Sequence, residues 1–422
     1  MPKRLLAIAA AVAAGFLFAQ FAARQFGAPS WWPNRDRDRN VRYFRDVLET
    51  VKQYYVEADK ADYDKLTRAA LRGMMSELDP HSEYLDAEAF SATEEELNNE
   101  FSGIGIQVEE RDGHIVVITP IADTPAERAG IRRGDRLVAI DGKPIADPTI
   151  EGVLRLIRGE PGSEVKLTIY RSSQDKEITV QLKRQKIRLR SVRNAEVRPD
   201  GIGYLQITQF SERTGEEFTD ALRQMEKSGL RALVLDLRNN PGGLFDAAVE
   251  VCDAFFEKDE LVAFTQGRTP ESRVDFHADG RHTARHYPVA ILVNGGTASA
   301  AEIVSGAMRD TKRAVIVGEK TFGKGSVQSI IELQNGEGIR LTTARYYTPS
   351  GVTIHEKGIA PHVEIEMSPD DEARLRIQQS RPDITAPAEF ADRFGFTPVE
   401  DTQLTAAEEV LRGILISRGQ PK

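Results

Sequence analysis

Cysteine is almost absent from this chain of 422 residues, which contains one, Cys252. A single cysteine excludes an internal disulfide. Its spacing with Ala248, Val249 and Phe256 is typical of one face of a buried helix, so we expect a small core residue rather than a cysteine nucleophile. The chain also has no long basic stripe, and its net charge of −9 gives no indication of nucleic-acid binding.

Histidine is scarce as well, with seven residues in total. Three of them, His277, His282 and His286, lie within one polar stretch. No carboxylate accompanies them at a convincing ligand spacing, which argues against a zinc site. We therefore expect neither a metal nor another cofactor.

Long apolar runs are lacking after the first residues of the chain. There, Lys3 and Arg4 precede an apolar run over 5–23 that only Gln20 interrupts. The run is about the minimum length that spans a bilayer and has a poor cleavage pattern, so it is either a membrane anchor or a cleaved secretory signal. In both cases the positive flank predicts that the rest of the chain lies in the periplasm or on the extracytoplasmic face of the inner membrane.

With 40% hydrophobic and 29% charged residues, the composition is that of a folded protein, and its length suggests two or three domains. Apolar residues recur at helical spacing from Val41 onward, and alternation of apolar residues replaces this pattern after Phe101. From residue 200, strands alternate with helices, which predicts an α/β core with a largely parallel sheet. The predicted parts are, in order, a signal peptide or anchor, a linker, a helical region, a β-rich domain, the α/β core and a C-terminal helical region: 1–27, 28–40, 41–100, 101–185, 186–368 and 369–422.

Ser299 is the candidate nucleophile. It follows the short apolar strand 289–294 and a glycine turn, and it opens a helix. At such a position backbone N–H groups have no intrahelical partner, so the N–H of Ala300 could bind a developing oxyanion. The alternative is that Ser299 merely caps the helix, a common role for serine.

Lys324 is the candidate base, because it lies between two glycines at the start of a predicted strand. To accept a proton near neutral pH, a lysine must lower its pKa from about 10.4 by roughly three units, which burial can achieve. Counting by two along the strand, Gln328 shares a face with Lys324 and could hold the amine toward Ser299. The alternative is a solvated surface lysine between flexible glycines.

Gly242 and Gly243 follow another buried strand in the turn Asn240-Pro-Gly-Gly. Such a turn can direct consecutive N–H groups at an anion, and by itself it is equally a phosphate cradle or a plain strand-to-helix turn. Beside Ser299 it would be an oxyanion hole. A serine, a lysine and this turn together suggest acyl transfer, most simply peptide-bond hydrolysis.

Six motifs, in order, resemble the carboxyl-terminal processing peptidases, the tail-specific serine proteases of bacterial envelopes and plastids: Leu78–Leu85, Phe101–Ile106, Asp236–Gly243, Asn294–Ile303, Gly318–Gln328 and Tyr346–Gly351. The resemblance implies a multidomain α/β protein with a crotonase-like protease core and an inserted PDZ domain at 101–185. Two of the family's usual serines are replaced here, by Thr297 and Ala301.

The resemblance also assigns roles to the candidate residues. It implies that Ser299 is the nucleophile, Lys324 the general base and Gln328 the third, orienting member. Oxyanion donors would then come from the N–H groups of Gly242 or Gly243 and Ala300.

The predicted PDZ domain contains a segment suited to peptide capture by β-augmentation. Gly103 and Gly105 would expose backbone N–H groups to a terminal carboxylate, and Ile104 and Ile106 would line an apolar pocket. The alternative is an ordinary glycine-bearing hairpin. Arg158 is a further candidate of this substrate-binding region, as a contact between the PDZ domain and the core; the alternative is a solvated arginine beside a turn.

We therefore expect a serine endopeptidase of the cell envelope that recognises protein C-termini through its PDZ domain. Its partners would be proteins with accessible C-terminal tails, and a homo-oligomer, an adaptor protein and N-terminal membrane association are compatible with the sequence. Two other classes stay open. One is a catalytically silent scaffold, and the other is a hydrolase of small acyl compounds, for which a PDZ domain would be hard to explain.

Overall fold

The computed structural model describes residues 34–145, 148–381 and 384–419. It divides into two compact units, one ending at Pro80 and the other beginning at His81. The predicted signal peptide or anchor lies outside the described residues, as do residues 28–33 of the predicted linker. Within the described ranges, no helix is both long enough and apolar enough to cross a bilayer.

The first unit contains two helices, α2 (Arg35–Tyr54) and α3 (Tyr63–Ser76). Asn34 and Asp62 cap them, each accepting a hydrogen bond from a backbone N–H three residues further on. None of the residues of α2 is buried. Several of its apolar side chains are exposed to solvent, among them Val41, Tyr43, Phe44 and Val47.

The predicted β-rich domain forms a sheet with the strand order β3-β4-β5-β7-β8, in which β6 pairs with β5. Its strands are β3 (Ile106–Arg111), β4 (His114–Pro120), β5 (Arg136–Ile140), β6 (Lys143–Pro144), β7 (Glu164–Arg171) and β8 (Lys176–Lys183), and its helices are α5 (Pro125–Arg128) and α6 (Ile150–Ile157). Inward-facing residues alternate along β7, where Val165, Leu167 and Ile169 are buried. The domain thus has an apolar core of its own.

The α/β core is built on a second six-stranded sheet with the order β10-β11-β12-β15-β16-β19. β10 is antiparallel to β11, and all other neighbours are parallel, as the alternation predicts. These strands are β10 (Val192–Val197), β11 (Ile202–Ile207), β12 (Ala232–Asp236), β15 (Val289–Val293), β16 (Ala314–Gly318) and β19 (Val363–Glu364).

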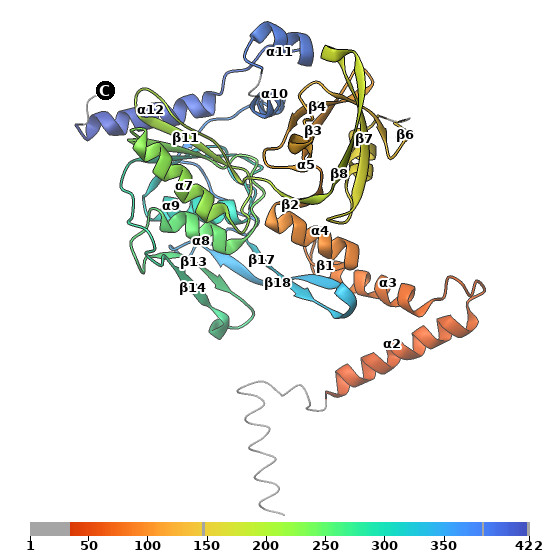
Figure 1. Cartoon of the computed structure of the whole chain (residues 1–422). Helices are drawn as coiled ribbons and strands as arrows, with labels where there is room; N and C mark the ends of the chain where they lie inside the picture. The colour runs from red at the N-terminus through yellow and green to blue at the C-terminus, as the bar shows by residue number, and fades with distance from the viewer. Residues whose placement is uncertain (1–33, 146–147, 382–383, 420–422) are drawn as a thin grey trace, which may run out of the picture. The chain divides into compact units, whose positions relative to one another are not determined.

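Helices cover both faces of this sheet, with α7 (Thr214–Lys227), α8 (Phe245–Asp253) and α9 (Ala300–Asp310) on one side and α12 (Thr402–Ser417) on the other (Figure 1). Side chains along each strand alternate between the two faces: Leu233 and Leu235 pack with α7–α9, whereas Val234 packs with α12. Cys252 lies in the first of these clusters and is fully buried, as predicted.

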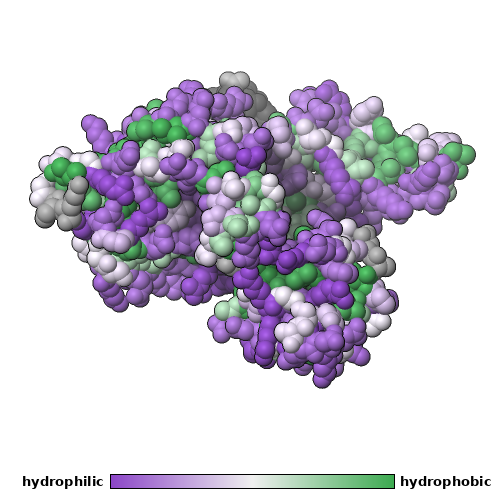
Figure 2. All heavy atoms as spheres, turned by 90° about the horizontal axis from the view of Figure 1, so that it is seen from above, coloured by the Kyte–Doolittle hydropathy of each residue, from purple (hydrophilic) through white to green (hydrophobic). Residues whose placement is uncertain are grey.

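A further sheet and several short elements complete the second unit. In this sheet β18 pairs with β1, β13 and β17, and β13 pairs with β14; separately, β2 pairs with β9. The bounds are β1 (Glu83–Leu85), β2 (Glu100–Gly103), β9 (Gln185–Arg188), β13 (Leu261–Gln266), β14 (Val274–His277), β17 (Ser326–Glu332), β18 (Gly338–Tyr347), α4 (Ala87–Asn98), α10 (Pro369–Ser380), α11 (Pro387–Phe394), and 3-10 turns at Ser172–Gln174, Pro270–Ser272 and Gln334–Gly336. Hydrophilic residues predominate on the face in Figure 2, where apolar residues form scattered patches.

Candidate active site

The three predicted catalytic segments follow three neighbouring strands of the parallel sheet. The glycine turn follows β12, Ser299 follows β15 and Lys324 follows β16, and these strands pair in that order. Loops at the carboxyl ends of parallel strands meet at one edge of the sheet, which is where ligand sites of open α/β folds form. Gly242 lies 57 positions before Ser299, and Lys324 lies 25 positions after it. The strand order places all three segments at a common edge, with the glycine turn on one flank and the lysine on the other.

Ser299 directly precedes α9 and is half-buried. Its φ of 54° and ψ of −117° lie outside the regions that non-glycine residues ordinarily occupy. Backbone strain of this kind costs about 1–3 kcal/mol and persists only where surrounding contacts enforce it. The next backbone N–H, that of Ala300, lies in the first turn of the helix and has no hydrogen-bond partner among the described residues, so it is available to an oxyanion.

A buried carboxylate connects the serine and lysine segments. Glu302 is fully buried on α9, and its Oε2 accepts hydrogen bonds from the backbone N–H of Ser299 (2.9 Å) and from that of Lys324 (2.8 Å). Because both bonds end on one atom, the two backbone nitrogens are no farther apart than these two lengths together. The other oxygen accepts from the Thr321 hydroxyl and the Gly323 N–H, at 2.5 and 2.7 Å.

The charge of this carboxylate is set by opposing effects. Burial raises the pKa of Glu302, and the four hydrogen bonds act in the other direction because they favour the ionised form. Each of the two carboxylate oxygens of Glu302 accepts a hydrogen bond from at least one backbone N–H. Glu302 therefore fixes the relative position of the Ser299 and Lys324 backbones.

The Lys324 side chain is half-buried, as the proposed base requires. Burial lowers the pKa of its amine, and the positive charge of Arg340 lowers it further, whereas Glu96 raises it. A neutral amine is thus more accessible here than on an open surface. In the described part of the chain, no direct hydrogen bond joins the Lys324 amine to the Ser299 hydroxyl.

Gln328 lies on β17, and its amide nitrogen donates to the hydroxyl groups of Ser326 (3.1 Å) and Thr342 (2.8 Å). These two bonds hold the side-chain amide in place. Its Oε1 atom is buried and has no hydrogen-bond partner among the described residues. Since a lysine amine is a donor, this unused acceptor has the polarity that the third member of the predicted triad needs.

The glycine turn packs directly against the serine. At Gly242 (φ +100°) a β-carbon would lie 2.6 Å from the β-carbon of Ser299 and 2.9 Å from the backbone nitrogen of Ala300, so only glycine fits. The Gly242 N–H donates to Asn240 Oδ1 at 2.9 Å. The Gly243 N–H has no partner within the described ranges and is the member of the predicted pair that is free to bind an oxyanion.

In the β-rich domain, Ile104 and Ile106 are both buried members of its apolar core. Among the described strands, β3 pairs only with β4, and its other edge is unpaired there, as β-augmentation by a peptide requires. Gly103 pairs with Gln185, and a β-carbon at Gly105 would overlap Thr124. Arg158 lies over the ring of Phe101 at 5.9 Å, and its contact with the core stays a prediction.

Known proteins share both halves of this architecture. The family model Peptidase family S41 matches residues 201–365, and a PDZ domain model matches 102–182. Over 394 residues the chain is 38% identical to the carboxy-terminal-processing protease of Bartonella bacilliformis, with 89% of each chain covered. The chain belongs to peptidase family S41.

This S41 peptidase has further relatives. It is 39% identical over 322 residues to the carboxy-terminal processing protease CtpA of Bacillus subtilis, covering 76% of the chain and 68% of the relative. A solved S41 protease structure from Bacteroides fragilis, 18% identical, aligns over 92% of this chain and 99% of that one with a TM-score of 0.50, a likeness of fold alone. The predicted family and fold class are confirmed, and the protein is a serine-type peptidase with a PDZ domain.

Two residues that hold the backbone of this candidate site, Glu302 and Asn240, are given no role by the sequence alone. Glu302 stands three residues after Ser299, a spacing typical of a capping box, which could have marked it as a partner of the Ser299 backbone. Its bond to Lys324 spans 22 positions and follows from no local pattern. Asn240 holds the glycine turn in a similar way. Its side-chain oxygen accepts a hydrogen bond from the Gly242 N–H, and its side-chain nitrogen donates one to the Ile207 carbonyl.

Proposed function

We propose that this S41 peptidase is a cell-envelope endopeptidase that recognises protein C-termini through its PDZ domain and cleaves through a Ser299–Lys324–Gln328 acyl-enzyme mechanism. The observation that carries the proposal is the shared acceptor Glu302 Oε2, which holds the Ser299 and Lys324 backbones beside each other. The lowered pKa of Lys324 supports its role as base.

The mechanism begins with a neutral Lys324 amine, which takes the proton of the Ser299 hydroxyl as the oxygen attacks the peptide carbonyl. The negative charge that develops on the carbonyl oxygen is met by the N–H groups of Ala300 and Gly243. Gln328 Oε1 accepts a hydrogen bond from the lysine and directs the amine toward the serine.

Collapse of the tetrahedral intermediate breaks the C–N bond, and the Lys324 ammonium returns its proton to the leaving amine. The acyl group is then esterified to Ser299. A water molecule attacks this ester as Lys324 takes a proton from it. When the second tetrahedral intermediate breaks the ester C–O bond, Lys324 returns this proton to the Ser299 oxygen and the product carboxylate leaves. The lysine is neutral at the start of each half-reaction, which is why a buried amine suits this role better than a solvated one.

The proposal also covers how the PDZ domain recognises the substrate and where in the cell the protein lies. The edge of β3 away from β4 would accept the substrate's C-terminal residues as an added strand. The N–H groups of Ile104 and Gly105, which have no hydrogen-bond partner among the described residues, would meet the terminal carboxylate. The basic flank and apolar run at the start of the chain support delivery to the envelope, either anchored or secreted. The exposed apolar face of α2 is compatible with self-association or with an adaptor.

The test is incubation of the purified chain with β-casein, an unstructured protein, followed by mass spectrometry of the products. We expect internal cleavage by the unaltered chain and none by Ser299→Ala or Lys324→Ala. Lys320→Ala is the matched control, because Lys320 is exposed in the same loop four residues earlier. Full activity of Lys324→Ala would remove lysine as the base, and turnover of small esters without any peptide cleavage would indicate an acyl hydrolase instead.

A further inference from the structure

The C-terminal helices α10 and α12 contact the loops that follow β12, β15 and β16. These are the loops that carry the glycine turn, Ser299 and Lys324. Each is contacted through a hydrogen-bonded polar side chain at the start of the loop, next to the strand that precedes it. The contacts come from three residues of the C-terminal segment: Glu372, Asp401 and Gln403.

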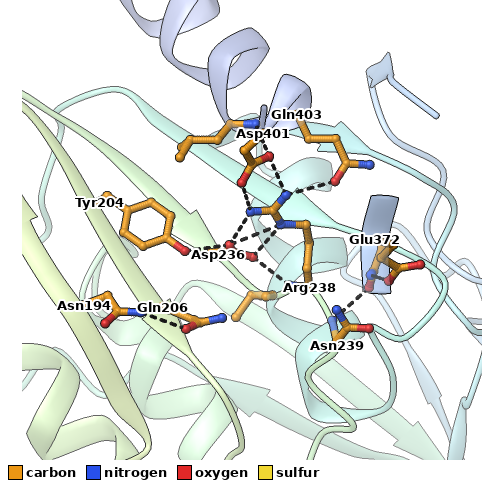
Figure 3. A network of polar contacts seen from close by, with 12 residues as sticks. Asn194, Tyr204, Gln206, Asp236, Arg238, Asn239, Glu372, Asp401 and Gln403 are labelled. Atoms are coloured by element: carbon orange, nitrogen blue, oxygen red, sulfur yellow. Dashed lines mark hydrogen bonds and ion pairs between the residues drawn. The ribbon is translucent and has the colours of Figure 1, made fainter. Parts of the chain in front are cut away.

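The first of these contacts surrounds Arg238, the second residue after β12. Its guanidinium is buried and paired with Asp236 at 2.7 Å and with Asp401 at 2.8 Å (Figure 3). Gln403 Oε1 accepts a further bond from it at 3.1 Å, and Tyr204 donates its hydroxyl to Asp236 at 2.7 Å. A buried guanidinium requires acceptors for all its donors, so Asp401 and Gln403 complete a shell that Asp236 alone does not fill.

The second contact is at Asn294, which directly follows β15. Its amide nitrogen donates to Glu372 Oε1 at 2.5 Å. Its oxygen accepts from the N–H of Asn239, at 2.8 Å, and from that of Gly296, at 3.1 Å. One side-chain amide therefore joins the glycine-turn loop to the serine loop, and α10 fixes its orientation.

The third contact reaches the loop after β16, which leads to Lys324. Gln403 donates to the Ile365 carbonyl at 2.8 Å and to Glu319 Oε1 at 3.3 Å. Glu319 also accepts from the Met367 N–H at 3.0 Å. Gln403 thus bonds to Arg238 with its oxygen and to the third loop with its nitrogen, so one buried side chain spans two of the three loops.

We propose that Glu372, Asp401 and Gln403 are positioning residues of the peptidase, which hold the three catalytic loops in register from the C-terminal segment. None of them touches the reacting atoms. They act through Arg238 and Asn294 on the Asn239–Gly243 turn and on the backbone that leads to Ser299. Small displacements of a nucleophile or oxyanion donor lower turnover more than they lower substrate binding, so these residues should govern kcat. The inference rests on the proposed Ser299 mechanism.

Asp401→Asn is the most selective test. Asp401 also caps α12 by accepting from the Leu404 N–H at 3.0 Å, and asparagine caps helices equally well. The substitution keeps Oδ1 but places an amide N–H₂ where Oδ2 accepts from Arg238, so that two donors face each other. Glu409→Gln is the matched control, since Glu409 is exposed on the same helix.

Glu372→Ala tests the second contact independently, with Asp370→Ala as its control. Both are acidic residues in the first turn of α10, but Asp370 is exposed. Both substitutions therefore remove one negative charge near the same helix terminus, but only Glu372→Ala removes the hydrogen-bond acceptor of the Asn294 side chain. This variant also keeps the proposal testable if Asp401→Asn folds poorly.

The measurements are kcat and KM on β-casein and the rate at which a fluorophosphonate labels Ser299 in the full-length chain. We expect kcat and the labelling rate to fall about tenfold or more in Asp401→Asn and Glu372→Ala, with KM changed less than about threefold and both controls unchanged. Variants that melt at a lower temperature but keep the kcat and labelling rate of the controls would overturn the proposal and leave a purely structural contact. If the unaltered chain neither cleaves nor is labelled at Ser299, the proposed function fails and the inference with it.

Discussion

Replacing Gly242 by alanine tests the packing of the glycine turn against the nucleophile. The added methyl group would lie 2.6 Å from the Ser299 β-carbon, 2.8 Å from the Ala298 carbonyl oxygen and 2.9 Å from the Ala300 nitrogen. Carbon atoms in contact are normally about 3.5–4.0 Å apart. Two of the three neighbours are backbone atoms, so the overlap is relieved only if the serine segment or the turn moves by a substantial fraction of an ångström.

The expected loss in the free energy of unfolding has two parts. A φ of +100° disfavours alanine by about 1–3 kcal/mol, and overpacking of this kind costs about 1–3 kcal/mol more. We therefore expect Gly242→Ala to lose roughly 2–6 kcal/mol of stability. Displacement of Ser299 relative to its base and oxyanion donors should lower kcat about a hundredfold, because catalysis is more sensitive to position than folding is.

Gly295→Ala is the matched control for this prediction. Gly295 lies in the serine loop itself, but a β-carbon there meets no atom within 4 Å. We expect it to retain kcat on β-casein and the rate of fluorophosphonate labelling, both measured well below each variant's thermal midpoint. Wild-type kcat in Gly242→Ala would refute the reasoning, since a nucleophile in contact with that methyl group could not keep its position.

Three further predictions follow from groups in the second unit. Because burial lowers the pKa of Lys324, kcat/KM should rise with pH as the amine becomes neutral and fall on the acid side, and a flat profile from about pH 8 to about pH 5 would contradict this. Glu302→Gln removes an acceptor from two of four donors and should lower kcat about a hundredfold, whereas unchanged turnover would show that Glu302 does not hold the site. Burial raises the pKa of the Cys252 thiol, so a thiol reagent should modify it only after denaturation; rapid reaction with the native chain would show that the core cluster is open.

The alternation of strands and helices in the α/β core was predictable because its sequence signals are local. Short apolar strands that alternate with helices predict the parallel sheet, and the order of the strands then places their loops at one edge. Ser299 and Lys324 were suggested by turn and strand positions, and the family resemblance favoured the catalytic interpretation of both.

Contacts between distant segments could not be predicted in the same way. Asp401 lies 163 positions from Arg238, and nothing in the spacing of either residue indicates the other. The amphipathic pattern near the end of the chain predicted a helix, but the sheet face it covers depends on the tertiary fold. The predicted helical region 41–100 is also divided, since β1 pairs with β18 more than 250 residues later and belongs with it to the second unit.

The position of α12 has a consequence for biosynthesis. Leu411 and Leu415 follow every strand of this sheet in the sequence, yet they share one apolar cluster with Tyr204 and Leu292 of its strands. A nascent chain that has emerged only as far as α11 therefore exposes the apolar side chains of this sheet face to water. Chains that stop before α12 should consequently aggregate or be degraded.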